Sequence, residues 1–166
     1  MDELTMDAEY REAIKLIAKG WHRPALDKLL PIAEAGHHAA QYEVGRYYSQ
    51  QRVDWKEAAK WFARAAERES PPAQYELGHC YMLGLGVPRD QRQAANWLKA
   101  AAENGHAGAA LDLGLLYLNG CDAMPICMQM ARFWLGNALW CDSARAAAEA
   151  GLEIAMRRDP FVPLTA

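Results

Sequence analysis

One stretch decides the fold because the chain carries it three times: Ala40-Gln41-Tyr42-Glu43-Val44-Gly45-Arg46-Tyr47-Tyr48, Ala73-Gln74-Tyr75-Glu76-Leu77-Gly78-His79-Cys80-Tyr81 and Ala109-Ala110-Leu111-Asp112-Leu113-Gly114-Leu115-Leu116-Tyr117. The copies are 33 and 36 residues apart, and each keeps an aliphatic residue, a glycine and a tyrosine at one spacing. An Ala-x-x-Trp pattern follows each copy and ends at Trp61, Trp97 and Trp134. Periods of this length indicate an array of stacked supersecondary units.

Each unit has the start and stop signals of two helices. In the second unit Pro72 is placed to open a helix, and Gly84-Leu85-Gly86-Val87-Pro88 ends it. Asp90 is placed to cap a second helix, which stops at Asn104-Gly105. Stretches that alternate with period two are missing, so we predict an all-α fold.

Both ends of the chain contain partial copies of the unit. Residues 7–36 predict a degenerate N-terminal helix pair, and 143–158 predict a single capping helix before a tail at 159–166. The three full units span 38–70, 72–106 and 107–142. We therefore expect one repeat domain over residues 1–166, an α-solenoid of about four antiparallel helix pairs with a C-terminal capping helix.

Residues 72–106 carry a specific motif set: Ala73, Leu77, Gly78, Tyr81, Gly84, Gly86, Val87, Asp90, Ala94, Trp97, Ala100, Ala101 and Gly105. This set resembles the Sel-one-like repeat, a relative of the tetratricopeptide repeat. The resemblance implies a right-handed superhelix. The first unit departs from the pattern because 49–53 has lost both loop glycines, and the third keeps only Gly120 before an unrelated loop.

Composition narrows the classes of partner. With 18 Lys+Arg against 21 Asp+Glu the net charge is −3, and no basic run suited to a phosphate backbone occurs, so no nucleic acid partner is expected. The most apolar stretch, 107–118, is too short for a membrane span. The acidic start, Met1-Asp2-Glu3, lacks the pattern of a secretory signal, which predicts a cytoplasmic protein with reduced thiols.

The sequence contains no recognisable catalytic or phosphate-binding motif, so we predict a protein that is not an enzyme and needs no cofactor and no metal. The alternative is a redox- or metal-responsive regulatory protein built on Cys121 and Cys127, which are six residues apart. Free thiols packed as small apolar groups explain the four cysteines more simply.

The resemblance also indicates which residues face a partner, because the first helix of each unit lines the concave side of such arrays. Counting from the aliphatic-Gly pair, these positions are Tyr42, Arg46, Ser49, Gln50, Tyr75, His79, Met82, Leu83, Leu111, Leu115, Leu118 and Asn119. The row is polar in the first unit and aliphatic in the third. An aliphatic run of this kind is costly to leave in water, so we expect a partner, a homodimer or the chain itself to cover it.

These features together predict a non-catalytic module that binds a protein or peptide on its concave face. The resemblance implies roles as an adaptor or scaffold, or as a bacterial immunity protein that covers the active site of a toxin.

Overall fold

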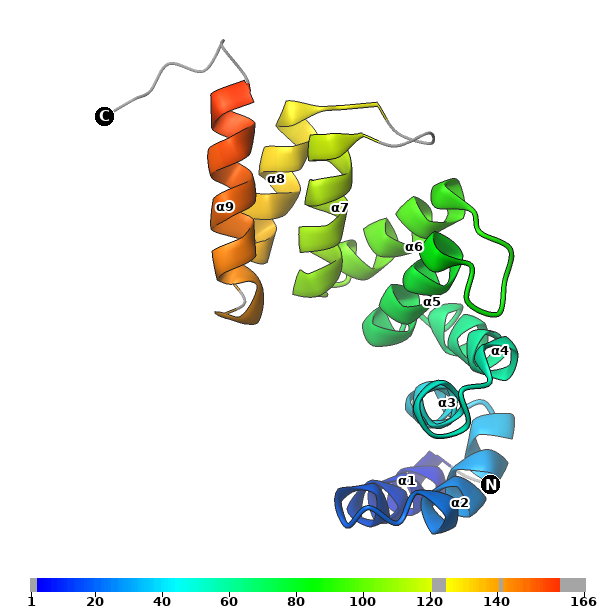
Figure 1. Cartoon of the computed structure of the whole chain (residues 1–166). Coiled ribbons are helices and arrows are strands. Elements are labelled where there is room, and N and C mark those ends of the chain that lie inside the picture. Colours follow the sequence, from blue (N-terminus) through cyan, green and yellow to red (C-terminus); the bar gives the residue numbers. More distant parts are fainter. Residues whose placement is uncertain (1–2, 121–124, 141, 159–166) are drawn as a thin grey trace.

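The computed structural model describes residues 3–120, 125–140 and 142–158, and within these ranges the chain is helical with no strand (Figure 1). In chain order the elements are α1 (Glu3–Ala18), α2 (His22–Glu34), α3 (His38–Tyr47), the π-helical turn η1 (Tyr48–Arg52), α4 (Trp55–Ala66), α5 (Pro71–Leu83), α6 (Gln91–Glu103), α7 (Ala107–Asn119), α8 (Met128–Ala138) and α9 (Asp142–Arg158). The prediction of an all-α fold is confirmed.

The helices follow one curved path from α1 to α9 (Figure 1). Each helix packs on the next helix in the chain, which gives the pairs α1/α2, α3/α4, α5/α6 and α7/α8, and α9 packs on both α7 and α8. This arrangement is an α-solenoid of four helix pairs with a capping helix, as the repeats predicted.

Side chains cap the helices at the positions that the repeat sets. Asp90 accepts hydrogen bonds from the backbone N–H groups of Arg92 and Gln93, at 2.9 and 3.1 Å, as predicted. His106 caps α7 differently, because its ring Nδ1 accepts from the backbone N–H of Ala109 at 3.1 Å. His37 caps α3 in the same way. A histidine cap needs an unprotonated Nδ1, so the starts of α3 and α7 depend on neutral rings.

In each repeat a glycine makes room for the residue that follows the recurrent tryptophan. A Cβ atom added to Gly45 would lie 2.6 Å from the Phe62 ring, and one added to Gly114 would lie 2.7 Å from Leu135. Gly78 stands in the same relation to Leu98, at 3.0 Å. Phe62, Leu98 and Leu135 are fully buried. The glycines therefore set the close approach of the two helices in each pair.

The loops inside the repeats differ. After α5 the chain turns through Gly84 and Gly86, both with positive φ, and a Cβ on Gly86 would lie 2.0 Å from the backbone oxygen of Trp55 at the start of α4. The loop of the second unit thus rests on the first unit. Those glycines are absent after α3. There the chain continues as the wider π-helical turn η1 and reverses direction at Val53, whose φ is 53°. A β-branched residue in this region is strained.

The capping helix α9 packs closely on α7 and α8 at its Gly151. A Cβ on Gly151 would lie 3.0 Å from Leu135 of α8 and 3.5 Å from Leu115 of α7. The Leu135 side chain therefore lies between Gly114 of α7 and Gly151 of α9. This contact turns the last three helices into a small bundle of nearly parallel rods (Figure 1).

Candidate functional site

We call the surface formed by the neighbouring faces of α3, α5 and α7 the concave surface. Several of the predicted partner-facing residues meet there. His79 and Met82 of α5 line an open groove together with Leu115 and Asn119 of α7. Asp112 and Leu116 complete its lining. Its lining combines three apolar residues with three polar ones, and the groove lies between two repeats.

A second hollow lies at the N-terminal end, between α1, α2 and α3. Arg46 and Gln50 line it with Ile17, Leu26 and other residues of the first helix pair. The Arg46 guanidinium is 3.3 Å from the Glu43 carboxylate, which neutralises its charge. The polar end of the predicted row is therefore less basic than Arg46 alone suggests.

A polar network joins α5 to α7. His79 Nε2 is 2.8 Å from Asp112 Oδ2, and the Tyr75 hydroxyl is also hydrogen-bonded to Asp112. The Tyr75 ring stacks on His106, with ring centroids 4.3 Å apart. Burial is the main reason that the pKa of Tyr75 rises to about 12, with the Asp112 carboxylate adding to the effect. Burial lowers the pKa of His106, which favours the neutral ring that caps α7.

An acidic residue occupies the same position in each of the three helices, directly before the aliphatic-Gly pair: Glu43, Glu76 and Asp112. Burial is the main cause that raises the pKa of the tyrosine on each preceding inner helix, and the charge of the acid raises it further in the pairs Glu43–Tyr10, Glu76–Tyr42 and Asp112–Tyr75. These acids were not among the residues that the repeat register predicted to face a partner. Their recurrence at one register was the signal that could have found them.

Glu76 differs from the other two acids. Burial raises the pKa of its carboxyl group, an effect that the positive charges of His79 and Arg46 reduce. Glu43 pairs with Arg46, and Asp112 accepts from His79 and Tyr75. Within the described part of the chain Glu76 makes no hydrogen bond or ion pair, and its oxygen atoms keep access to solvent.

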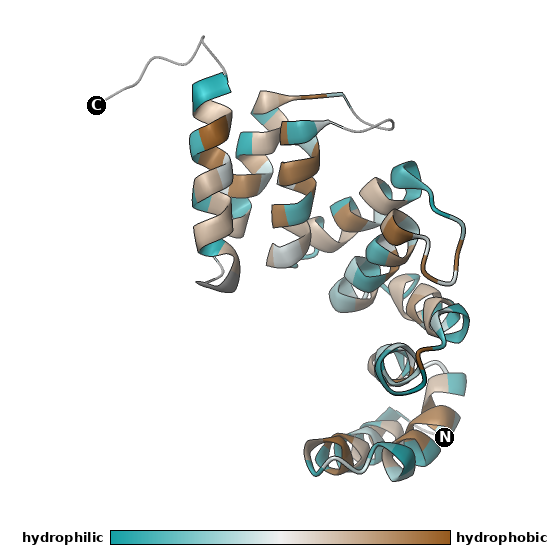
Figure 2. Ribbon diagram, in the orientation of Figure 1, coloured by the Kyte–Doolittle hydropathy of each residue, from teal (hydrophilic) through white to brown (hydrophobic). Residues whose placement is uncertain are grey.

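The structure corrects the prediction for the aliphatic end of the row. Leu118 is 2% exposed and packs in a core cluster with Leu135 and Ala155, so it belongs to the core and not to the surface. Leu111 and Leu115 are half-buried against that same cluster, which Leu152 of α9 also joins. The capping helix thus covers much of the apolar run on α7, which is one of the most hydrophobic ribbons in Figure 2.

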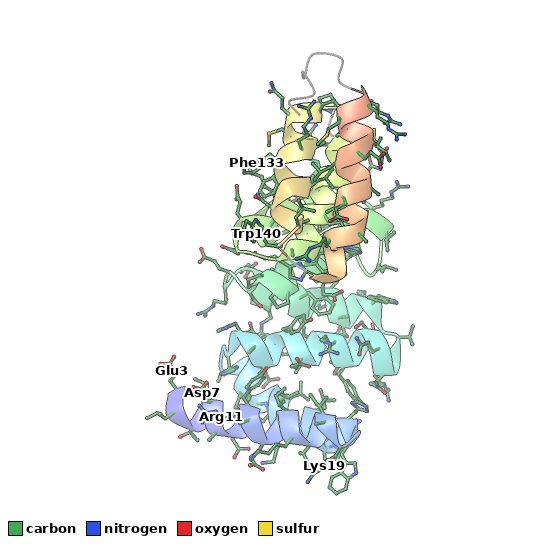
Figure 3. All side chains as sticks on the ribbon, turned by 90° about the vertical axis from the view of Figure 1, so that its left-hand side faces the viewer. Glu3, Asp7, Arg11, Lys19, Phe133 and Trp140 are labelled. Atoms are coloured by element: carbon green, nitrogen blue, oxygen red, sulfur yellow. The ribbon has the colours of Figure 1, made fainter. Side chains whose placement is uncertain are left out.

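The remaining predicted residues differ in exposure. Tyr42 and Tyr75 are half-buried, Ser49 is buried, and Gln50 is exposed. Leu83 is 61% exposed at the end of α5. Two other large apolar residues, Phe133 and Trp140, are exposed on α8 and just after it, away from the predicted row (Figure 3).

The described residues give little support to the alternative redox- or metal-responsive role. Cys80 is buried, and this burial raises the pKa of its thiol to about 12, which makes it a poor nucleophile. Cys127 precedes α8 as a free thiol, and Cys121 lies outside the described residues. Where side chains are described, no group of three or more His, Cys, Asp or Glu residues could hold a metal ion.

None of the helices in the described ranges combines the length and the apolar character needed to cross a bilayer.

The helix pairs, the glycine contacts between them and the buried Trp61 and Trp134 define a helical repeat protein of the solenoid class. Within this class the Sel1 repeat model matches residues 38–70, 71–106 and 107–125, more than half of the chain. The chain belongs to the Sel1 repeat family.

Two solved structures support this assignment. A Sel1 repeat protein from Oxalobacter formigenes superposes with a TM-score of 0.81 at 25% identity, over 89% of this chain and 60% of that protein. The protein c5321, a protective antigen of uropathogenic Escherichia coli strains with the same repeat fold, superposes with a TM-score of 0.83 at 29% identity, over 94% of this chain and 34% of that one. The chain therefore spans less than two thirds of the length of either relative. Sel1 repeat proteins generally mediate protein–protein interactions.

Proposed function

We propose that the protein is a non-catalytic interaction module that binds one protein or peptide partner on its concave surface. The observation that carries this proposal is the groove between α5 and α7, where His79, Met82, Leu115 and Asn119 meet from two repeats. Apolar walls with a few polar groups are typical of a surface that buries a partner side chain. Sel1 repeat membership supports a protein as the ligand.

An adaptor or a bacterial immunity protein is the role that suits this proposal best, in a cytoplasmic setting. Either role needs a preformed surface of several repeats and no chemistry of its own. The alternative redox or metal role would rest on Cys121 and Cys127, and nothing in the described residues favours it over protein binding. A homodimer through the same groove is the second candidate occupant.

Affinity capture with matched variants tests the proposal. Asn119→Arg places a bulky cation in the groove, whereas Gln129→Arg makes the same kind of change on α8; both original side chains are exposed. Wild-type and variant proteins with equal melting curves are immobilised and exposed to native lysate. We expect one protein to be lost with Asn119→Arg and retained with Gln129→Arg.

Retention of the same partner by both variants would place binding elsewhere on the molecule. Capture of the chain itself, together with a concentration-dependent mass in sedimentation, would identify the homodimer as the occupant.

A further inference from the structure

The three acids of the concave surface differ in how their charge is compensated. Glu43 has the Arg46 guanidinium at 3.3 Å, and Asp112 has the His79 ring at 2.8 Å and the Tyr75 hydroxyl. His79 stands at the register of Arg46, yet it pairs with the acid of the next repeat. Glu76 is therefore left without a hydrogen bond or an ion pair within the described part of the chain, while the charges of His79 and Arg46 still act on it.

Such a carboxylate reduces the stability of the free protein. Burial without a compensating hydrogen bond disfavours the charged form, and this is the main reason that the pKa of Glu76 is raised. Groups that lower stability in this way are often retained where binding needs them. Because its oxygen atoms keep access to solvent, a group from outside can reach them.

The surroundings of Glu76 suit a cation. Tyr75 precedes Glu76 as Tyr42 precedes Glu43, and the charge of Glu76 acts on both tyrosines. The faces of tyrosine rings attract ammonium and guanidinium groups. The same combination already exists one repeat earlier, where the Arg46 guanidinium lies 5.9 Å from the Tyr42 ring centroid and pairs with Glu43. In the second repeat the residue at the register of Arg46 is His79, which pairs with Asp112. No described residue therefore forms an ion pair with Glu76, although the charges of His79 and Arg46 act on it.

We propose that the concave surface recognises a basic segment of its partner, and that an arginine or lysine side chain of this segment enters between α3 and α5 to pair with Glu76. The inference rests on the proposed binding function and names the chemistry of the partner. An acidic segment is disfavoured because Glu43, Glu76 and Asp112 line one surface and only the first has a full cation beside it.

Selection from a random peptide display library tests the proposal. Wild-type protein, Glu76→Gln and the matched control Glu67→Gln, whose side chain is exposed just after α4, are each used as bait. We expect wild type and Glu67→Gln to enrich peptides with arginine or lysine at a fixed position, and Glu76→Gln to lose this preference.

A double-mutant cycle then measures the pair. The best peptide and its version with glutamine at the basic position are titrated into the three proteins by fluorescence anisotropy. Either single change should weaken binding about tenfold or more, since a charge-assisted hydrogen bond is lost, and both changes together should cost no more than one. Glu76→Gln should melt at or above the wild-type temperature, which separates lost binding from lost folding.

The outcomes distinguish the two proposals. Enriched peptides that are acidic or uncharged, or equal binding of the basic and glutamine peptides to wild type, would overturn the basic partner and leave the binding function standing. Failure of wild type to enrich any peptide over an unrelated bait would overturn the proposed function itself.

Discussion

Two joints of the array, the places where one inner helix meets the next, differ in what covers their inner side. One lies between α7 and α9, and the other lies between α3 and α5. At the first joint, Leu111 and Leu115 of α7 and Leu152 of α9 pack against one core cluster, in which Leu118 is buried. At the second joint, Tyr42 of α3 and Glu76 of α5 are half-buried, and α3 and α5 both pack on α4. The apolar inner residues of α7 thus close the end of the array, whereas Tyr42 and Glu76 on the inner side of α3 and α5 are polar and half-buried.

Leu118→Glu gives the strongest test of this comparison. An unpaired carboxylate in the α7/α9 core should cost more than about 3 kcal/mol of unfolding free energy. Leu83→Glu adds the same charge to a position that is 61% exposed, so it should change stability by less than about 0.5 kcal/mol. Urea unfolding of the two variants measures the difference, and similar costs would mean that α9 does not seal this joint.

Gly86→Ala should cost about 2 to 3 kcal/mol. The new methyl group would meet the backbone oxygen of Trp55, and alanine is also strained at a φ of +73°. Gly105→Ala is the control, because its φ is also positive but no atom lies within 4 Å of the added carbon. Equal melting temperatures for the two variants would show that the loop after α5 does not rest on α4.

His106→Ala should cost about 1 kcal/mol at pH 8, through the lost cap of α7. The folded state lowers the pKa of His106 below its ordinary value of 6.5, so the unfolded chain binds this proton more tightly. The contribution of the ring is complete above pH 6.5 and declines as the pH falls toward the folded-state pKa. Melting curves from pH 8 to pH 5 should therefore show the gap between wild type and variant closing; a constant gap contradicts a neutral cap.

Val53→Gly should raise stability by less than about 1 kcal/mol, the smallest of these effects. Glycine relieves the strain of the left-handed turn after η1, and part of that gain is lost to the greater entropy of the unfolded chain. Val53→Ala keeps a Cβ at the same φ and serves as the control, with a smaller change expected. A clear loss of stability in Val53→Gly, measured in urea, would indicate that the side chain contributes packing despite its 68% exposure.

The repeat register predicted much of the fold because it is local information. The positions of Gly45, Gly78 and Gly114, the cap at Asp90 and the extent of α9 all follow from short patterns. The path after α3 did not follow, since a loop without its glycines can turn in several ways, and the chain uses η1 with a strained Val53.

The candidate site was predicted less completely. The register assigned His79, Met82, Leu115 and Asn119 to the concave side, where they line one groove, but it also assigned the buried Leu118 to that surface. The position of α9 on α7 depends on how three helices pack around Leu135. This packing cannot be read from the sequence of a single repeat. The pairing of His79 with Asp112, 33 residues away, also depends on the angle between two units.

The wedge of Leu135 between two glycines also has a mechanical consequence. Because α9 packs on both α7 and α8, bending the array at this end must disrupt two interfaces at once. By contrast, α3 and α5 are linked chiefly through α4. A pulling force on the array, or a partner that increases its curvature, should therefore change the angle between α3 and α5 near Tyr42 and Glu76. The last three helices should then move together as one rigid body.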